Sequence, residues 1–138
     1  MRSVPRARVV PAPGLRVLIV EDSPPIAQIF AILLKHLGHE AQIASTGAAA
    51  LEMLPDFKPE IIFSDISMPG MTGYQLAEQI RRQPQFANIW LVAMTGYGQS
   101  EDRQQALQAG FDEHLVKPAE LPQLEALFAH VQARREAR

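Results

Sequence analysis

Short apolar runs alternate with segments of helical periodicity through most of the chain, and this alternation is the feature that most limits the fold. The runs at residues 17–20, 61–64 and 89–94 are rich in large apolar side chains, as are parallel strands buried on both faces. Between the first two runs, apolar residues follow the 3.6-residue helical period at Ile26, Ile29, Phe30, Leu33, Leu34 and Leu37. Repeated strand–helix–strand units predict an α/β fold built around a parallel sheet.

Weaker signals complete the expected set of five parallel strands and five helices. The remaining strands are predicted at residues 40–44 and 113–116. The remaining helices are predicted at residues 47–54, from Thr72 onwards, at residues 100–109 and near the C-terminus. Pro55 and Pro59 are expected to bracket the loop that follows the second of the five helices.

One domain is expected over residues 15–133, because 138 residues with 47% hydrophobic content suit a single core. Residues 1–14 contain three prolines without apolar periodicity, which predicts a flexible tail or linker, and residues 134–138 are expected to form a C-terminal tail. The chain has no cysteine and no apolar run of about 20 residues, so disulfides, Cys-ligated metal sites and membrane spans are excluded. We therefore expect a soluble, cytoplasmic protein.

Charge is distributed unevenly, since arginines at both ends leave an acidic middle within a net charge of −2. A nucleic-acid surface needs a clustered basic face, so this domain is not expected to bind nucleic acid. An acidic middle is compatible with binding of a divalent cation.

Four predicted strands end in polar or charged residues. These are Glu21 and Asp22 after the first strand, Asp65 after the third, Thr95 after the fourth and Lys117 after the fifth. In an open parallel α/β sheet, ligands bind outside the carboxyl ends of the strands, where these side chains would converge. The sequence therefore predicts one site assembled from four strands.

The residue types at this edge suit phosphoryl transfer. Carboxylates gathered at one edge repel one another unless a cation lies among them, and an all-oxygen ligand set favours Mg²⁺. Asp65 supplies an oxygen nucleophile, whereas Lys117 and the Thr95 hydroxyl supply donors for phosphoryl oxygens. We expect Glu21 and Asp22 to hold the metal beside Asp65.

The combined pattern resembles the response-regulator receiver family of two-component signalling over residues 15–133. The pattern consists of paired acids after strand 1, Asp65 with the Met-Pro-Gly-Met-Thr-Gly segment at residues 68–73, Thr95-Gly96 and Lys117-Pro118. The resemblance implies a flavodoxin-like sheet with strand order 2-1-3-4-5. Residues 94–99 and 114–118 further resemble receivers attached to hybrid sensor kinases.

The resemblance also implies a mechanism and partners. A phosphohistidine on a histidine kinase or a histidine phosphotransfer domain would donate its phosphoryl group to Asp65, with the Ser67 main-chain carbonyl as a further Mg²⁺ ligand. The Lys117–Pro118 bond is expected to be cis. Thr95 and an aromatic residue on strand 5 would then reshape the face made by helix 4, strand 5 and helix 5. That face would bind an effector domain or protein, or a second phosphorylated copy.

This chain departs from the family pattern at His114, which stands where tyrosine or phenylalanine is usual. We expect His114 to act as the switch residue with altered coupling, since its charge depends on pH. Ser67 and Tyr97 occupy positions that tune the lifetime of the phosphoryl group, and Tyr97 is expected to shield it from water.

Two other functions fit parts of the pattern. An aspartyl-phosphate hydrolase would also use a strand-end aspartate and Mg²⁺, but such enzymes usually carry a second aspartate where this chain has Ser67, and the loop at residues 66–72 is short. A binding module that works without phosphorylation is the other alternative. The intact set of acids, Thr95 and Lys117 favours a receiver, which catalyses only its own phosphorylation and slow dephosphorylation.

Overall fold

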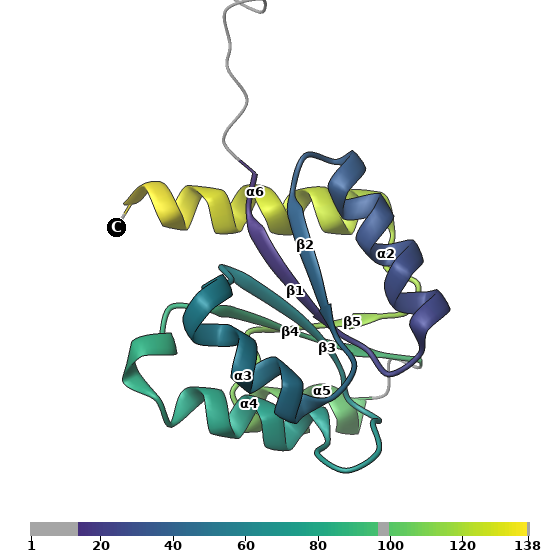
Figure 1. The fold of residues 1–138 in the computed structure, drawn as a ribbon, viewed down its shortest axis with the longest axis vertical. Helices are drawn as coiled ribbons and strands as arrows, with labels where there is room; N and C mark the ends of the chain where they lie inside the picture. Colours follow the sequence, from purple (N-terminus) through teal and green to yellow (C-terminus); the bar gives the residue numbers. More distant parts are fainter. Residues whose placement is uncertain (1–13, 97–99, 138) are drawn as a thin grey trace, which may run out of the picture.

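The computed structural model describes residues 14–96 and 100–137, with the side chains of residues 100–102 left out, and has a five-stranded parallel sheet (Figure 1). The strand order is β2-β1-β3-β4-β5, as predicted. The strands are β1 (Arg16–Val20), β2 (Glu40–Ala44), β3 (Ile61–Asp65), β4 (Trp90–Thr95) and β5 (Glu113–Val116). The helices are α2 (Pro24–His36), α3 (Gly47–Phe57), α4 (Gly73–Arg81), the 3₁₀ helix η1 (Pro84–Phe86), α5 (Ser100–Ala109) and α6 (Leu121–Ala137).

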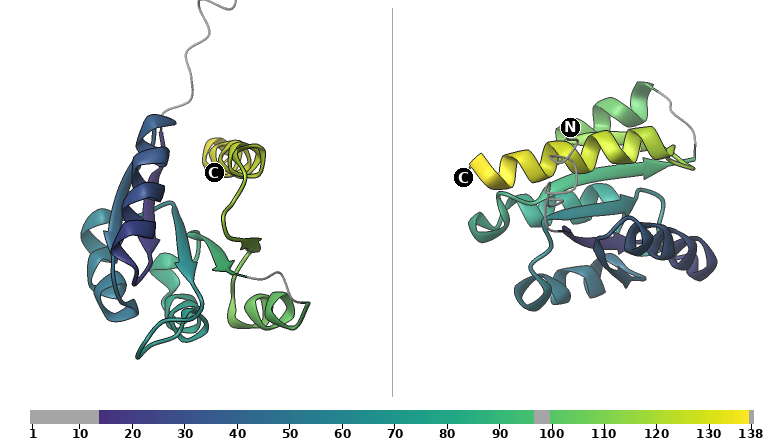
Figure 2. Two further views of the ribbon diagram at one scale, coloured as in Figure 1. Left: turned by 90° about the vertical axis from the view of Figure 1, so that its right-hand side faces the viewer. Right: turned by 90° about the horizontal axis from the view of Figure 1, so that it is seen from above.

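Helices cover both faces of the sheet, with α2 and α6 on one side and α3, α4 and α5 on the other (Figures 1 and 2). Alternate residues of β1 serve the two layers, because Leu18 and Val20 pack with α3 and α4 whereas Val17 and Ile19 pack with α2 and α6. This double burial explains why β1 is apolar at successive positions. Among the described residues, no helix has the length and apolar character needed to cross a bilayer.

Local signals place most helix ends correctly. Thr72 caps α4 by accepting from the Gln75 backbone N–H at 3.2 Å, and the Gln75 side chain accepts from the Thr72 N–H at 2.9 Å, which forms a capping box. Gly38 follows α2 with φ = +97°, in the left-handed region that glycine adopts at low cost.

Two predicted boundaries are wrong. Helix α3 continues through Pro55 to Phe57 and ends at Lys58, which has φ = +52° and donates its N–H to the Leu54 carbonyl at 3.0 Å. Burial of Phe57 against the core offsets the backbone bond that Pro55 removes. Helix α6 continues to Ala137, so most of the expected C-terminal tail at residues 134–138 is helical.

A polar network anchors the far end of α6 to the amino edge of the sheet. Arg135 Nη1 donates to Glu60 Oε2 at 3.0 Å and to the Gly14 carbonyl at 3.4 Å. The Leu15 N–H donates to His39 Nδ1 at 3.0 Å, and the His39 ring packs on Phe128 of α6 at 4.2 Å between centroids. These contacts fix the entry to β1 and explain the extension of α6.

Candidate functional site

Parallel register brings the polar strand ends to one edge of the sheet. Val20 pairs with Ser64, Asp65 with Met94 and Thr95 with Val116, so the residues that follow β1, β3 and β5 lie beside one another. This edge is opposite the Glu60–Arg135 network. The convergence predicted from the strand ends is therefore present in the structure.

The carboxylates of Glu21, Asp22 and Asp65 form a cluster in which one oxygen from each lies within 4.8 Å of the others. Glu21 is 6% exposed, Asp22 is exposed and the Asp65 side chain is 12% exposed. Three carboxylate oxygens this close suit a hard divalent cation such as Mg²⁺, which takes oxygen ligands and retains water on its open side. The donor set thus fits the predicted metal.

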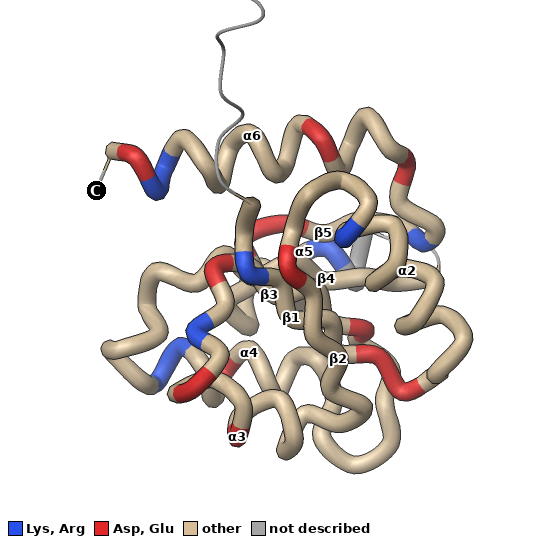
Figure 3. The backbone as a smooth tube through the Cα atoms, turned by 45° about the horizontal axis from the view of Figure 1, so that its top comes forward, with Lys and Arg blue, Asp and Glu red and all other residues tan. Residues whose placement is uncertain are grey.

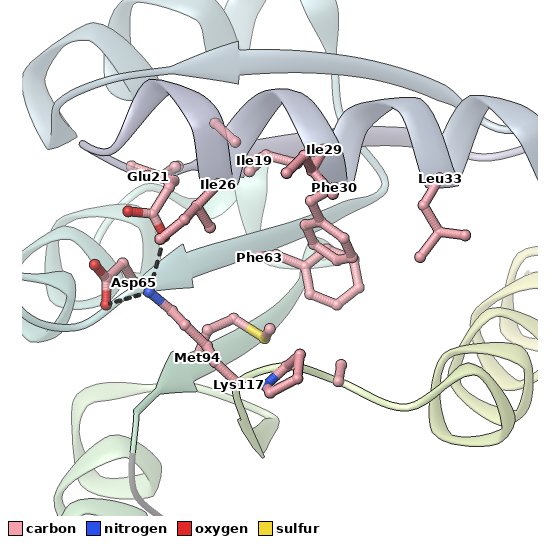
Figure 4. A pocket seen from close by; sticks show the side chains of 14 residues that line it. Ile19, Glu21, Ile26, Ile29, Phe30, Leu33, Phe63, Asp65, Met94 and Lys117 are labelled. Atoms are coloured by element: carbon pink, nitrogen blue, oxygen red, sulfur yellow. Dashed lines mark hydrogen bonds and ion pairs between the residues drawn. The ribbon is translucent and has the colours of Figure 1, made fainter.

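Lys117 reaches back across the edge from the end of β5 and binds two of these acids (Figure 4). Its Nζ lies 2.8 Å from Glu21 Oε1 and 3.3 Å from Asp65 Oδ1. The Lys117–Pro118 peptide bond is cis, as predicted. The ammonium group therefore neutralises part of the negative charge that the three acids bring together.

Glu21 is engaged through both of its oxygens. Besides the Lys117 bond to Oε1, the Ser23 N–H donates to Oε2 at 3.1 Å. Glu21 thus joins the start of α2 to the lysine, and its burial fixes the side chain. The sequence indicated Glu21 as an acid of the metal site but gave no sign that it also positions Lys117.

The surroundings shift the pKa values of Asp65 and Lys117. Burial raises the pKa of Asp65, and the charges of Glu21 and Asp22 raise it further, whereas Lys117 opposes the change. Burial lowers the pKa of Lys117, but its hydrogen bond to Glu21 and the charge of Asp65 outweigh burial, so the net pKa is raised. Lys117 accordingly stays protonated at neutral pH beside a carboxylate whose ionisation costs free energy.

Thr95 and His114 meet between β4 and β5. Thr95 is 8% exposed at the end of β4, and its Oγ1 lies 3.1 Å from Nε2 of the half-buried His114. The tautomer of the imidazole decides which atom donates. The structure thus connects the predicted switch pair directly, although no chemical role follows from the contact alone.

Two predicted positions are not joined to this constellation. Ser67 is exposed in the loop between β3 and α4, and its roles as a carbonyl ligand and in phosphoryl lifetime stay predictions. Tyr97 lies outside the described residues.

A cavity of about 400 Å³ beside Asp65 was not predicted. Its walls come from α2, from the sheet and from the segment after Lys117, and they are apolar except for Glu21, Asp65 and Lys117 at one end (Figure 4). The helical period placed Ile26 and Ile29 on one apolar stripe of α2. These two side chains are 49% and 69% exposed, so part of the stripe borders the cavity and solvent.

Comparison with known proteins gives a consistent assignment. The family model of the response regulator receiver domain matches residues 17–129. The chain is 36% identical over 120 residues to the aerobic respiration control sensor protein ArcB of Escherichia coli, a match that covers 86% of this chain and 15% of ArcB. It is 30% identical over 118 residues to the DNA-binding dual master transcriptional regulator RpaA of Synechocystis, covering 86% of this chain and 48% of RpaA. The chain therefore spans less than half of either relative.

A solved structure adds information on the metal. The receiver domain of the sensor histidine kinase PA1611 from Pseudomonas aeruginosa, which has a magnesium ion coordinated in its active site cleft, matches with a TM-score of 0.79 at 26% identity. The match covers 87% of this chain and 98% of that domain. Relatives thus include the receiver of a sensor kinase as well as a transcriptional regulator.

Proposed function

The chain belongs to the response regulator receiver family, and we propose that Asp65 accepts a phosphoryl group from a phosphohistidine. The observation that carries this proposal is the position of Asp65, whose Oδ1 lies 3.3 Å from Lys117 Nζ within the three-carboxylate cluster. An Asp65 oxygen forms the new bond to phosphorus, and the imidazole nitrogen of the donor leaves with the electrons of the P–N bond. The donor is a cytoplasmic histidine kinase or histidine phosphotransfer domain.

Each neighbour of Asp65 has a part in this transfer. Glu21, Asp22 and Asp65, with the Ser67 carbonyl, would hold Mg²⁺, which supplies positive charge for the phosphoryl oxygens when bound. Lys117 lies close enough to Asp65 to follow a phosphoryl oxygen with its ammonium group, and Glu21 keeps the lysine at this edge. The Thr95 hydroxyl donates to a second phosphoryl oxygen. Slow attack by water later frees Asp65.

The Thr95–His114 contact supports a route from Asp65 to a binding face. When Thr95 turns toward the phosphoryl group, its bond to His114 Nε2 is lost and the imidazole changes rotamer in response. Leu107, Val116 and Leu121 are exposed on α5, β5 and α6, where an effector would dock. An NMR comparison of the His114 ring with and without a beryllofluoride phosphate mimic tests this route. An unchanged His114 rotamer contradicts it.

The direct test of the acceptor uses a small phosphodonor. The protein is incubated with Mg²⁺ and acetyl phosphate, and intact mass spectrometry follows the addition of one phosphoryl group. We expect an acid-stable, base-labile adduct on the parent and on Asp56→Asn, an exposed control on α3, but none on Asp65→Asn. Absence of an adduct on the parent, or its persistence on Asp65→Asn, contradicts the proposal.

The same experiment separates the alternatives. A receiver holds the phosphoryl group and releases it slowly, so phosphate release stays well below one equivalent per protein while the adduct accumulates. An aspartyl-phosphate hydrolase would instead release many equivalents rapidly. A module that works without phosphorylation would show neither adduct nor release.

A further inference from the structure

Helix α2 exposes an apolar surface that leads to Asp65. Ile29 and Ile32 are 69% and 68% exposed, and Ile26 is 49% exposed nearer the carboxylates. The helix carries no Asp, Glu or Arg and a single lysine, Lys35, at its far end (Figure 3). Ile26 and Ile29 line the 400 Å³ cavity, and Ile32 extends the exposed apolar surface of the same helix. We call these three side chains and the cavity the α2 groove. An apolar surface that ends at charged groups is typical of a binding site.

The chain enters the described fold at the opposite end of the same helix. A Cβ atom on Gly14 would collide with the carbonyl oxygen of Gly38, just after α2, so the two backbones touch there. Arg135 of α6 binds the Gly14 carbonyl from the other side. The described part of the chain therefore begins at Gly14, between the C-terminal ends of α2 and α6.

The length of helix α2 matches the reach of the chain between Arg8 and Gly14 when that stretch is extended. Helix α2 has 13 residues and so spans about 20 Å, from Gly38 back to the loop that holds Glu21 and Asp22. Arg8 precedes Gly14 by six residues, which reach about 20 Å when extended. An extended segment running back along α2 would thus bring Arg8 to the acidic cluster, with Arg6 still in reach.

The chemistry of this segment complements the groove. Residues 1–13 carry Arg2, Arg6 and Arg8 with no acidic residue. The site has the opposite charge, because it gathers three carboxylates, of which two bind the ammonium of Lys117. Val9 and Val10 fall between Arg8 and Gly14, so they would lie over the isoleucines of α2. Pro11 and Pro13 favour the extended backbone that this path needs.

We propose that residues 6–10 of this chain bind the α2 groove, with Val9 and Val10 on the isoleucines and the guanidinium groups of Arg6 and Arg8 at the carboxylate cluster. The arginines of the bound segment compete with Mg²⁺ for the carboxylates, and this effect on regulation rests on the proposed function. Docking itself depends only on the groove and on the charges.

Paramagnetic relaxation tests the docking without reference to phosphorylation. Because the chain has no cysteine, Val4→Cys gives a single site for a spin label. We expect the label to broaden the amide signals of Ile29, Ile32 and Asp22, while Leu54 on the opposite face keeps its intensity. The double variant Ile29→Asp/Ile32→Asp, which alters only exposed side chains, should remove the broadening. Broadening that is absent, or unaffected by this variant, overturns the proposal.

Mixing experiments distinguish this chain's own segment from that of a second copy. Spin-labelled protein without ¹⁵N enrichment is mixed with ¹⁵N-labelled protein that carries no spin label. Loss of the broadening in the mixture supports binding within one chain, whereas its persistence shows binding between copies and overturns the proposal.

Calorimetric titration with Mg²⁺ tests the competition. An exposed arginine–carboxylate contact of typical strength corresponds to about a five-fold change in affinity, so Arg6→Glu/Arg8→Glu should bind Mg²⁺ about five-fold more tightly than the parent. The double variant Arg82→Glu/Arg138→Glu, which changes the net charge by the same amount at the exposed Arg82 and at the other end of the chain, is the charge-matched control and should leave the affinity unchanged. Equal affinities of the parent and the double variant overturn the competition. Loss of Mg²⁺ binding by all variants would instead contradict the metal site in the proposed function.

Discussion

Replacing Asp65 by asparagine should stabilise the metal-free protein, because the folded state brings the Asp65 charge near two other carboxylates. At an effective dielectric constant of about 20, two like charges 4.8 Å apart repel by about 3.5 kcal/mol, and opposite charges 3.3 Å apart attract by about 5 kcal/mol. Two such repulsions and one such attraction leave a net repulsion of about 2 kcal/mol on Asp65. Screening of the exposed Asp22 by water lowers this cost, whereas burial of the Asp65 carboxylate adds to it. We therefore expect Asp65→Asn to raise the free energy of unfolding by about 1–2 kcal/mol.

Urea unfolding at neutral pH in a metal chelator measures this difference. The predicted gain corresponds to a rise in the midpoint of about 0.5–1 M urea for a domain of this size. Adding Mg²⁺ should stabilise the parent more than Asp65→Asn, because only the parent keeps all three carboxylates. The difference in the free energy of unfolding between the two proteins should therefore become smaller. Glu125→Gln, an exposed carboxylate-to-amide change on α6, should alter the free energy by less than about 0.5 kcal/mol. The reasoning is refuted if the metal-free parent is at least as stable as Asp65→Asn.

Two further predictions concern the scaffold. Arg81→Met should lower the free energy of unfolding by about 2–3 kcal/mol in urea titrations, because Arg81 binds Asp112 at 2.7 Å and three backbone carbonyls. The exposed Arg82→Met should cost less than about 0.5 kcal/mol. Burial and the charge of Arg135 lower the pKa of His39 below 6.5, so the unfolded chain takes up this proton first and stability falls as the pH drops below 6.5. The amide oxygen of His39→Asn can still accept from the Leu15 N–H, and this variant should lose less stability than the parent between about pH 7 and pH 5; an equal loss would contradict the assignment.

The fold could be predicted because the strands are buried on both faces and their sequences show it. The continuous apolar run from Val17 to Val20 is typical of a strand buried on both faces. Parallel pairing of such strands then places the residues that follow each strand at one edge of the sheet. Residue type suffices to indicate what Asp65 and Lys117 can do there. Local rules were equally effective at Thr72, where the cap depends on neighbours three residues away.

Features that depend on distant partners could not be predicted. Nothing near Pro55 shows that the burial of Phe57 keeps α3 helical beyond it. The bond from Lys117 to Glu21 joins residues 96 positions apart, and the contact between Arg135 and Glu60 joins residues 75 positions apart. Periodicity and caps report on the first few neighbours of a residue and contain no information about such pairs.

The two edges of the sheet differ in how fully their carboxylates are neutralised by partners. This difference agrees with a proposed site at the carboxyl edge and none at the amino edge. At the amino edge, Glu60 is held by Arg135 and receives the Arg16 N–H at 3.0 Å, so the carboxylate has partners for both oxygens. At the carboxyl edge, Asp22 and Asp65 add negative charge that Lys117 offsets only in part, because its ammonium is shared with Glu21. The uncompensated charge disfavours the free protein, but it also suits the site to the divalent cation proposed above. A variant that balanced this edge internally would be more stable and would bind Mg²⁺ less tightly.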